Sequence, residues 1–316
     1  DEIKPLIVER MKAIFSFSEE EYPDIAQDIR KGLEGGKHLR GSLCVLVSDA
    51  LGGDRDRALS YGACIDGTHF STLIHDDLID QDRERRGRVS FWVKHGPRKA
   101  VAVGDRLFAL VKKRFLELGQ KEASIYAETL DTITSGVAQE INLGEFAIDF
   151  VTGRVHRNLY PKIARAKTAS LFRAAAKLGA MAAGAKEEQE EKLARYGELV
   201  GLSFQIADDL CDVALVQKAG RPQADKLASV VLMGIHYDSV SFRNLLRPLV
   251  RGEGMLNVIS RSRLEERAVK DIRAKVREAN DCLRGIRMRR PYSDYLRGYA
   301  EYAVGALLEE ANLSLS

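Results

Sequence analysis

Residues 74–80 read I-H-D-D-L-I-D and residues 206–212 read I-A-D-D-L-C-D, so the pattern I-x-D-D-L-x-D occurs twice in this chain. Each copy lies inside an apolar stretch whose hydrophobic residues recur at helical spacing. Residues four apart share one face of a helix, so the first and last aspartates of each copy converge, with the middle one about 100° round. The repeat therefore predicts two equivalent acidic turns on two separate helices.

Converging carboxylates repel one another on a helix, and a bound cation would remove that cost. Mg²⁺ takes one or two carboxylates together with substrate phosphate oxygens and keeps several waters, which suits two sparse aspartate turns around a diphosphate. A solvated acidic face is the ordinary explanation of one such motif alone. Two copies in apolar sequence favour metal binding. The predicted ligands are Asp76, Asp77, Asp80, Asp208, Asp209 and Asp212.

Outward from these turns, the chain has few β-strand signals and many Ala, Leu, Glu, Lys and Arg residues at helical spacing. Gly52-Gly53 and Gly96-Pro97 are typical helix breaks. We predict an all-α fold forming a single domain over residues 1–316, with residues 221–254 as its least regular part and a candidate lid. The clearest expected helices span 43–51, 58–79, 99–118, 124–146, 160–185 and 192–216.

The composition excludes several classes of function. The 316 residues, 45% of them hydrophobic, can bury a large core, and 49 Lys and Arg against 46 Asp and Glu leave a net charge of only +3. No nucleic-acid partner is expected from so even a balance. No apolar run has the roughly 18 residues needed to cross a bilayer, so no stable membrane insertion is expected. The four widely spaced cysteines fit a reducing, cytoplasmic setting better than a disulfide framework or a zinc site.

Basic residues complement the acidic turns. Residues 35–40 read G-G-K-H-L-R, which places Lys37 and Arg40 after two glycines, where backbone and cations can approach a phosphate closely. Arg85 and Arg86 follow the first acidic turn and could clamp a diphosphate. Each feature has an ordinary alternative, a surface turn for the first and local charge neutralisation for the second.

Taken in order, these motifs closely resemble the trans-isoprenyl diphosphate synthase family over roughly residues 30–226. The resemblance implies an antiparallel helical bundle around a central cavity, usually in a homodimer, with both aspartate turns at the cavity mouth. The resemblance rests on residues 35–40, His69, Asp76-Asp77-x-x-Asp80, Arg85-Arg86-Gly87, Lys167-Thr168 and Phe204-Gln205-x-x-Asp208-Asp209-x-x-Asp212.

The same resemblance implies a role for each residue. Asp76, Asp80 and Asp208 would hold Mg²⁺ ions, three in all, on an allylic diphosphate, with Asp77, Asp209 and Asp212 in support. The contacts to that allylic diphosphate would come from Arg85, Lys167, Thr168 and Gln205. The contacts to isopentenyl diphosphate would come from Lys37, Arg40, His69 and Arg86. Arg221 stands where the family usually has Lys, and Ser229-Val230 stands where it usually has a second Gly-Lys pair.

Product length is a further expectation. In the family a bulky residue before the first aspartate turn forms a floor for the growing tail, and here Ser71 occupies that position, about 7.5 Å along the helix axis from Asp76. Thr72 and Thr68 are its neighbours, and a serine cannot block the tail. We therefore expect geranylgeranyl or geranylfarnesyl diphosphate, and a longer product if no neighbouring helix intrudes.

The function predicted from the sequence is a prenyltransferase that condenses isopentenyl diphosphate head-to-tail (1'-4, trans) with an allylic diphosphate. Two alternatives stay open. A class I terpene cyclase also uses a DDxxD turn, although its second metal motif normally mixes Asn, Ser or Thr with Glu, whereas Asp208 to Asp212 repeats the first motif. A degenerate subunit of a heteromeric synthase is the other alternative, although all six aspartates are present.

Overall fold

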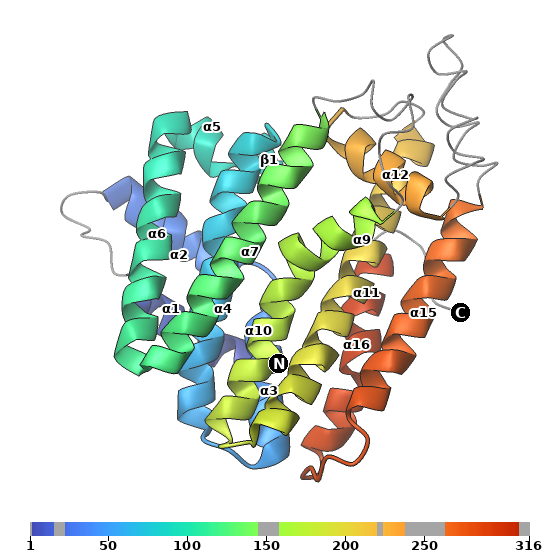
Figure 1. The fold of residues 1–316 in the computed structure, drawn as a ribbon. Coiled ribbons are helices and arrows are strands. Elements are labelled where there is room, and N and C mark those ends of the chain that lie inside the picture. The colour runs from blue at the N-terminus through green and yellow to red at the C-terminus, as the bar shows by residue number, and fades with distance from the viewer. Residues whose placement is uncertain (1, 16–22, 145–157, 220–223, 238–262, 310–316) are drawn as a thin grey trace. The chain divides into compact units, whose positions relative to one another are not determined.

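The computed structural model describes residues 2–15, 23–144, 158–219, 224–237 and 263–309 (Figure 1). These residues are almost entirely helical, and the strands among them are a single two-stranded hairpin. The all-α prediction is thus confirmed. Within the same residues, no helix combines the length and the apolar character needed to cross a membrane.

Two compact units divide the chain, the first made of Asp1–Thr129, Ala174–Ala194 and Ile286–Leu296. The second comprises Leu130–Arg173, Arg195–Gly285 and Arg297–Ser316. Several of the divisions fall inside helices, so those helices supply residues to both units. The single-domain expectation stays a prediction.

The first unit contains the helix that carries the first aspartate turn. Its elements are α1 (Ile3–Ile14), α2 (Pro23–Glu34), α3 (Leu39–Leu51), α4 (Arg55–Ile79), β1 (Glu84–Arg85), β2 (Arg88–Val89), α5 (Phe91–His95), α6 (Pro97–Leu118) and the start of α7 (Gln120–Gly144). α3 ends where Gly52 adopts a left-handed conformation, φ 75°, and α4 begins where the Asp54 side chain accepts from the backbone N–H of Arg57. The predicted break at Gly52-Gly53 is therefore confirmed.

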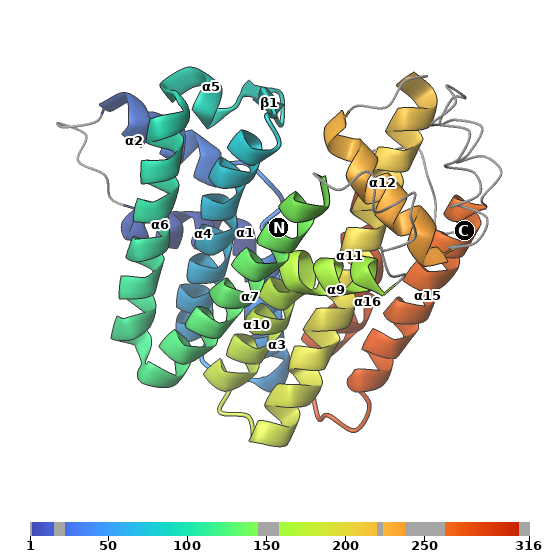
Figure 2. The ribbon, with the colours of Figure 1, turned by 45° about the horizontal axis from the view of Figure 1, so that its top comes forward.

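Close packing of α3 on α4 depends on paired glycines. A Cβ placed on Gly41 of α3 would lie 2.8 Å from the carbonyl oxygen of Gly62 on α4, closer than real side chains approach. The missing side chains let the two backbones touch, and almost every residue of α3 is buried as a result. α6 packs along another side of α4, as Figures 1 and 2 show.

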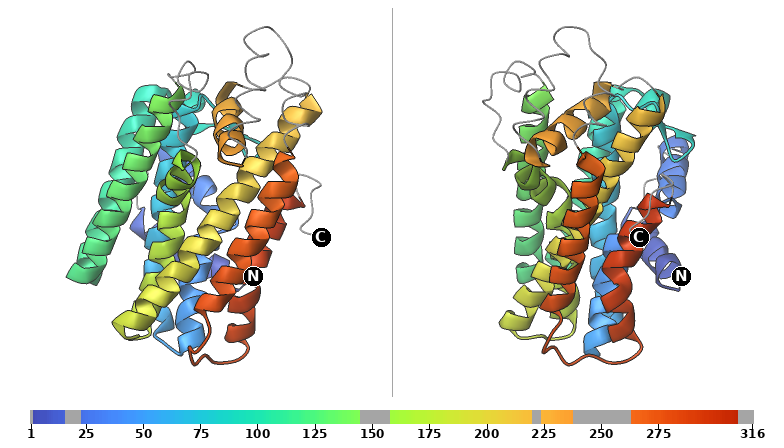
Figure 3. Two further views of the ribbon diagram at one scale, coloured as in Figure 1. Left: turned by 45° about the vertical axis from the view of Figure 1, so that its right-hand side comes forward. Right: turned by 90° about the vertical axis from the view of Figure 1, so that its right-hand side faces the viewer.

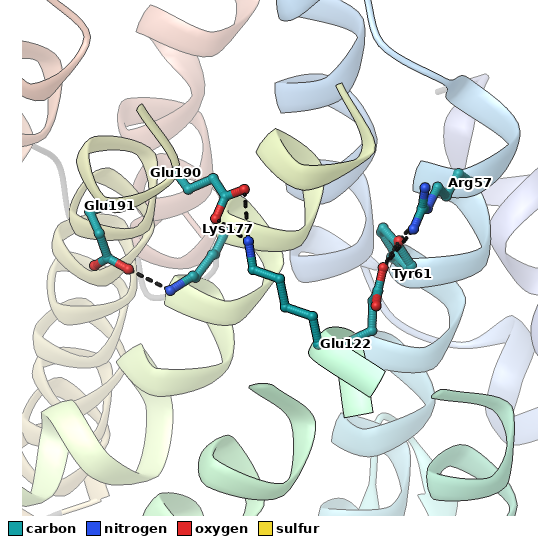
Figure 4. Close-up of polar contacts among 7 residues, drawn as sticks. Arg57, Tyr61, Glu122, Lys177, Glu190 and Glu191 are labelled. Carbon is teal, nitrogen blue, oxygen red and sulfur yellow. Dashed lines mark hydrogen bonds and ion pairs between the residues drawn. The ribbon is translucent and has the colours of Figure 1, made fainter. Parts of the chain in front are cut away.

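A polar network ties the start of α7 to α4 at the end of α4 that lies far from the aspartates (Figure 4). Glu122 accepts from the Tyr61 hydroxyl at 2.5 Å and from Arg57 Nη2 at 2.7 Å, and Arg57 Nε also donates to that hydroxyl. Burial opposes ionisation of Glu122, but the hydrogen bonds from Tyr61 and Arg57 hold the pKa of its carboxyl below the usual value. The neighbouring Lys121 pairs with Glu190, at 3.0 Å.

The second unit carries the second aspartate turn. Its helices are the rest of α7, α9 (Leu159–Ala164), the π-helix η1 (Arg165–Ala169), part of α10 (Ser170–Ala182), most of α11 (Glu187–Ala219), α12 (Ala224–Tyr237), α15 (Leu264–Cys282) and most of α16 (Tyr292–Leu308). α12 packs on α15 (Figure 3). The Tyr237 hydroxyl of α12 donates to Asp271 of α15 at 2.9 Å. α12 lies within the segment 221–254, so its described part is helical, which the sequence-based expectation of irregularity missed.

One predicted helix differs from expectation. The periodicity favoured one continuous helix over residues 160–185, but the structure inserts a wide π turn at Arg165–Ala169, closed by the Ser170 N–H donating to the Arg165 carbonyl. Two glycines accommodate it: a Cβ on Gly136 of α7 would lie 2.7 Å from Ala166 Cβ, and one on Gly201 of α11 would lie 2.6 Å from Ala169 Cα. Such π turns inside helices are frequent at functional sites.

Candidate active site

The first aspartate turn ends α4. Asp80 is the C-cap residue, and its N–H donates to the Asp76 carbonyl at 2.8 Å. Asp77 is buried, while Asp76 is half-buried and Asp80 exposed. The C-terminus of a helix carries partial negative charge, so carboxylates placed there are destabilised until a cation arrives. The two accessible carboxylates are thus predisposed to bind a cation.

The middle aspartate of this turn is anchored by the protein. Asp77 accepts a hydrogen bond from Arg85 Nε, and Arg85 Nη2 also lies 3.4 Å from Asp82. Burial raises the pKa of Asp77, an effect that the neighbouring Arg85 opposes. Arg85, predicted to contact the allylic diphosphate, thus sits directly beside the first aspartate turn.

A tight hairpin turn brings the next arginine to the basic loop. Arg86 and Gly87 both have positive φ, 52° and 71°, between β1 and β2. The Arg86 guanidinium rests against Gly36, at a spot where a Cβ would collide with it. Gly36 is needed for a second reason, because its own φ is 88°. The structure therefore brings Arg86 to residues 35–40.

Four positively charged or titratable side chains surround His69, and we name them with it the cation cluster: His38, Arg40, His69, Arg85 and Arg86. Burial lowers the pKa of His69 well below its usual value, and the charge of Arg40 lowers it further. Burial likewise lowers the pKa of Arg86, and the charge of Arg85 adds to the effect. The charges of Arg40, Arg85 and Arg86 all act on His69, and such a concentration of guanidinium groups suits an anion.

In the second unit, the second aspartate turn on α11 repeats the pattern of the first. Asp208 is exposed and Asp212 half-buried, whereas Asp209 is buried and accepts from the Tyr160 hydroxyl at 2.6 Å and from Gln205 Nε2 at 3.1 Å. Burial raises the pKa of Asp209 to about 8, and the charges of Asp208 and Asp212 also raise it. Each turn thus fixes its middle aspartate and leaves the outer two accessible.

The π-helix presents its predicted residues to the same part of the second unit. Thr168 donates from its hydroxyl to Gln205, and Lys167 Nζ pairs with Glu140 at 2.6 Å. Lys167, Glu140 and Gln205 line a pocket of about 280 Å³, a volume that includes space open to solvent. Its lining is Glu140, Tyr160, Ile163, Ala164, Lys167, Gln205, Asp209 and Leu232.

The fit to a metal follows from this donor set. Within the described residues, no three Asp, Glu, His or Cys side chains form a cluster that could hold a metal ion by themselves. Each turn offers two accessible carboxylates, which suits a cation such as Mg²⁺ that completes its shell with water and phosphate oxygens. Arg221 lies outside the described residues.

The residues predicted to set product length lie on the buried part of α4. Ser71 and Thr68 are fully buried, and each hydroxyl donates to a carbonyl one turn back, Ser71 to Gly67 at 2.9 Å and Thr68 to Cys64 at 2.8 Å. The half-buried Thr72 does the same toward His69. These hydroxyls are satisfied within the helix, so their apolar atoms face the neighbouring helices.

Neighbouring aromatic side chains fill space that the sequence alone left open. A Cβ on Gly67 would lie 2.8 Å from the Phe15 ring. Tyr126 of α7 hydrogen-bonds Thr68, donates to the Phe108 carbonyl at 3.2 Å, and stacks on Phe115 with 4.9 Å between ring centroids. The sequence left open whether neighbouring helices enter this space. In the structure the rings of Phe15 and Tyr126 lie against Gly67 and Thr68, one helical turn from Ser71.

Tyr160 and Glu140 are site residues that sequence reasoning missed. Tyr160 holds Asp209 from 49 residues away, and Glu140 holds Lys167 from 27 residues away. Neither lies in a repeat or at a motif spacing, so the sequence carries no signal for them.

Comparison with known proteins places these features in one family. The model of the polyprenyl synthetase family matches residues 23–248, so the chain belongs to that family. It is 35% identical over 181 residues to a geranylgeranyl diphosphate synthase of Methanosarcina mazei, covering 57% of this chain and 55% of that protein. It is 29% identical over 236 residues to component 2 of a heptaprenyl diphosphate synthase of Geobacillus stearothermophilus, covering 69% of this chain and 72% of that protein.

The fold agrees with the family. The crystal structure of a polyprenyl synthase from Caulobacter crescentus CB15, complexed with calcium and isoprenyl diphosphate, matches with a TM-score of 0.77 and 26% identity over 96% of this chain and 93% of that one. The chain spans little more than half the length of most of the curated relatives that it matches.

Proposed function

We propose that this chain is a prenyltransferase that condenses isopentenyl diphosphate head-to-tail (1'-4, trans) with an allylic diphosphate, giving geranylgeranyl diphosphate or a longer polyprenyl diphosphate. The observation that carries the proposal is the repeated design of the aspartate turns, each with an anchored middle carboxylate and two accessible outer ones. The cation cluster in the first unit supplies the second requirement, a place for another diphosphate.

In this proposal the allylic diphosphate is held by Asp76, Asp80 and Asp208 through Mg²⁺, three ions per site, with Arg85, Lys167, Thr168 and Gln205 on its oxygens. Bound Mg²⁺ would neutralise the charge that develops on the departing diphosphate. Asp77 and Asp209, which protein hydrogen bonds already fix, would support these ligands by holding each turn in place. Asp212 would support them through direct or water contacts.

Isopentenyl diphosphate would bind at Lys37, Arg40, His69 and Arg86. The C1–O bond of the allylic substrate then breaks, C4 of isopentenyl diphosphate bonds to that C1, and C2 of the former isopentenyl unit loses a proton to the departing diphosphate. The chain's task is to hold the two reactants together and exclude water, so no side chain is required as a strong base. We also propose that the enzyme is a cytoplasmic homodimer.

Two observations bear on the alternatives. A terpene cyclase has one diphosphate to bind, so a second basic site, with the buried Arg40 and the charges of Arg85 and Arg86 acting on His69, would have no use. The likeness to one component of a heptaprenyl synthase keeps the heteromeric alternative testable, because a chain that needs a second component would be inactive alone.

The test is to replace Asp76 or Asp208 with Ala. Each change removes an accessible carboxylate without opening a core cavity, so condensation should fall by about 10³-fold or more, ~4 kcal/mol in the barrier, while the fold is kept. Asp131→Ala, at an exposed aspartate of α7, is the matched control and should keep full activity. Turnover of the Asp76 or Asp208 variant within threefold of the wild type would rule out the assignment.

A further inference from the structure

His38 occupies an unusual position at the start of α3. It is the N-cap residue, with φ 49° and ψ 38° in the left-handed region, which non-glycine residues seldom adopt. Its side chain is only 6% exposed, and its Nδ1 lies 3.2 Å from Asp66 Oδ2. Its other ring nitrogen, Nε2, is buried and has no partner among the described residues. A buried polar atom left in this way is costly and calls for a partner supplied from outside the chain.

The Asp66 carboxylate holds both this ring and the backbone beside it. Asp66 lies on α4, its side chain is 4% exposed, and its Oδ1 accepts from the Gly41 N–H at 3.0 Å. Gly41 permits this approach, because a Cβ there would collide with Oδ2. One carboxylate therefore fixes the end of the basic loop and the orientation of the His38 ring.

The His38–Asp66 pair lies within the cation cluster. His38 is close enough to His69 to contribute to its electrostatic environment, as are Arg40 and Arg86. Asp66 in turn interacts electrostatically with Arg86. The unpartnered nitrogen thus lies among the groups assigned above to the diphosphate of isopentenyl diphosphate.

We propose that His38 Nε2–H donates a hydrogen bond to the diphosphate of isopentenyl diphosphate, and that Asp66 is a positioning residue that accepts Nδ1–H and aims the ring. The assignment rests on the proposed function and adds two residues to its isopentenyl site. Both ring nitrogens would then be hydrogen-bonded, Nδ1 to Asp66 and Nε2 to the diphosphate. A hydrogen bond to a charged phosphate oxygen is among the stronger ones in proteins.

Two substitutions of His38 separate its two nitrogens. His38→Asn keeps a short amide able to donate to Asp66 and tolerates the left-handed backbone, but it has no atom at the place of Nε2. His38→Gln reaches further and can place an amide near that position. We expect His38→Asn to raise the Kd and KM for isopentenyl diphosphate roughly tenfold or more. The KM for the allylic substrate should stay within about twofold of the wild-type value. The KM of His38→Gln for isopentenyl diphosphate should lie between the values of His38→Asn and the wild type.

His95 provides the matched control, because its Nε2 pairs with Asp28 at 2.6 Å and its side chain is 8% exposed. His95→Asn makes the same chemical change in a similarly buried His–Asp pair, and it should leave both KM values within about twofold of the wild type. A rise in the KM for isopentenyl diphosphate with this variant as large as with His38→Asn would overturn the assignment to His38.

A double-mutant cycle tests Asp66. Asp66→Asn should raise the KM for isopentenyl diphosphate in the wild type, and its effect should shrink by at least about threefold in the His38→Asn background, because it acts through that ring. Equal effects in the two backgrounds would show that Asp66 does not position His38.

Binding of isopentenyl diphosphate, measured by calorimetry without allylic substrate, keeps this proposal separate from the proposed function. If the wild type condenses the substrates and His38→Asn, folded by circular dichroism, keeps the wild-type Kd, the His38 contact is wrong and the function stands. If the wild type neither binds isopentenyl diphosphate nor condenses it, the proposed function fails and the His38 assignment fails with it.

Discussion

At the scale of single residues, the two aspartate turns have the same arrangement of buried and accessible carboxylates. Asp77 and Asp209 are buried and held by protein donors, while the outer aspartates keep access to solvent. An anchored carboxylate fixes the turn, and two solvent-accessible carboxylates suit a cation that keeps some of its waters. Corresponding carboxylates of the two sequence repeats therefore have similar surroundings in the structure.

Lys37 is the exposed cation of the basic loop. Lys37→Ala should raise the KM for isopentenyl diphosphate about tenfold and change the KM for the allylic substrate by less than twofold, since it removes a contact to one diphosphate only. Steady-state kinetics with each substrate varied in turn measure both values, with Lys31→Ala, an exposed lysine of α2, as the control. Equal rises in the two KM values would mean that residues 35–40 do not select one substrate.

Candidate site residues could be predicted where the same residue types repeat at a fixed spacing in the sequence. They could not be predicted where their position depends on contacts made only in the folded chain. Four-residue spacing of carboxylates indicated both acidic turns, and a cation beside two glycines indicated the basic loop. Which carboxylate is buried depends on Tyr160 and Arg85, whose contacts bridge 49 and eight residues. The role of His38 depends on a contact to Asp66 across 28 residues, so no local pattern could reveal it.

At the scale of elements, glycines decide how the functional helices approach one another. Sequence periodicity located α4, α6, α7 and α11, because a long amphipathic or buried helix leaves a regular pattern. It could not locate the π turn at Arg165–Ala169, because one extra residue in a turn barely disturbs that pattern. The helices that flank the π turn accommodate it through Gly136 and Gly201.

Gly136→Ala should therefore displace the π turn and the Lys167 and Thr168 side chains that it carries. The added Cβ would lie 2.7 Å from Ala166 Cβ and 3.0 Å from the Lys167 backbone nitrogen. Overpacking of this kind costs about 1–3 kcal/mol, so we expect a lower melting temperature and a fall in kcat/KM of about tenfold. Ser135→Ala, at the exposed neighbouring position, should change neither. An unchanged kcat/KM in a folded Gly136→Ala protein would show that the π turn does not position these residues.

The network around Glu122 predicts a pH-dependent contribution to stability. Because the folded state holds the pKa of Glu122 below its unfolded value, the carboxylate stabilises the fold above about pH 4.3 and this contribution is lost as the pH falls through the folded pKa. Glu122→Gln should lower the free energy of unfolding by about 1–3 kcal/mol at pH 7, because Arg57 and Tyr61 lose a charged partner. The difference from the wild type should stay constant from pH 7 down to about pH 4.3 and should narrow as the pH falls further.

Urea unfolding of the two proteins across that pH range measures this effect. Glu117→Gln, at an exposed glutamate whose partner Arg114 lies three residues away, is the control and should cost less than about 1 kcal/mol. A difference between Glu122→Gln and wild type that does not narrow as the pH falls from about 4.3 to about 3 would show that the network does not depend on the ionised carboxylate.

At the scale of the whole molecule, the proposed function requires residues from both compact units. The first carries Asp76 and the cation cluster, and the second carries Asp208 and the π turn. Family membership and the fold follow from motifs spread along the chain, which is why the sequence alone could indicate them. The proposed limit on product length would depend on packing between helices that are distant in sequence, which the sequence alone does not reveal.

Two substitutions test that limit. Ser71→Phe should shorten the main product, because a ring at this fully buried position fills the path of the tail, whereas Ser71→Ala should leave the product unchanged. Tyr126→Ala should lengthen the product, because it removes the ring that lies against Thr68, and Tyr126→Phe, which keeps the ring, should not. Mass spectrometry of the dephosphorylated products reads out both changes. Identical product lengths in Ser71→Phe, Tyr126→Ala and wild type would mean that the tail does not pass along this part of α4.

The most direct measurement is mass spectrometry of the products that the wild-type protein forms from isopentenyl diphosphate with dimethylallyl, geranyl or farnesyl diphosphate in the presence of Mg²⁺. Prenyltransfer predicts linear diphosphates of geranylgeranyl length or longer, one diphosphate released for each isopentenyl unit added, and no product when Mg²⁺ is chelated. A cyclic hydrocarbon formed without isopentenyl diphosphate, or an allylic substrate recovered unextended, would contradict the account.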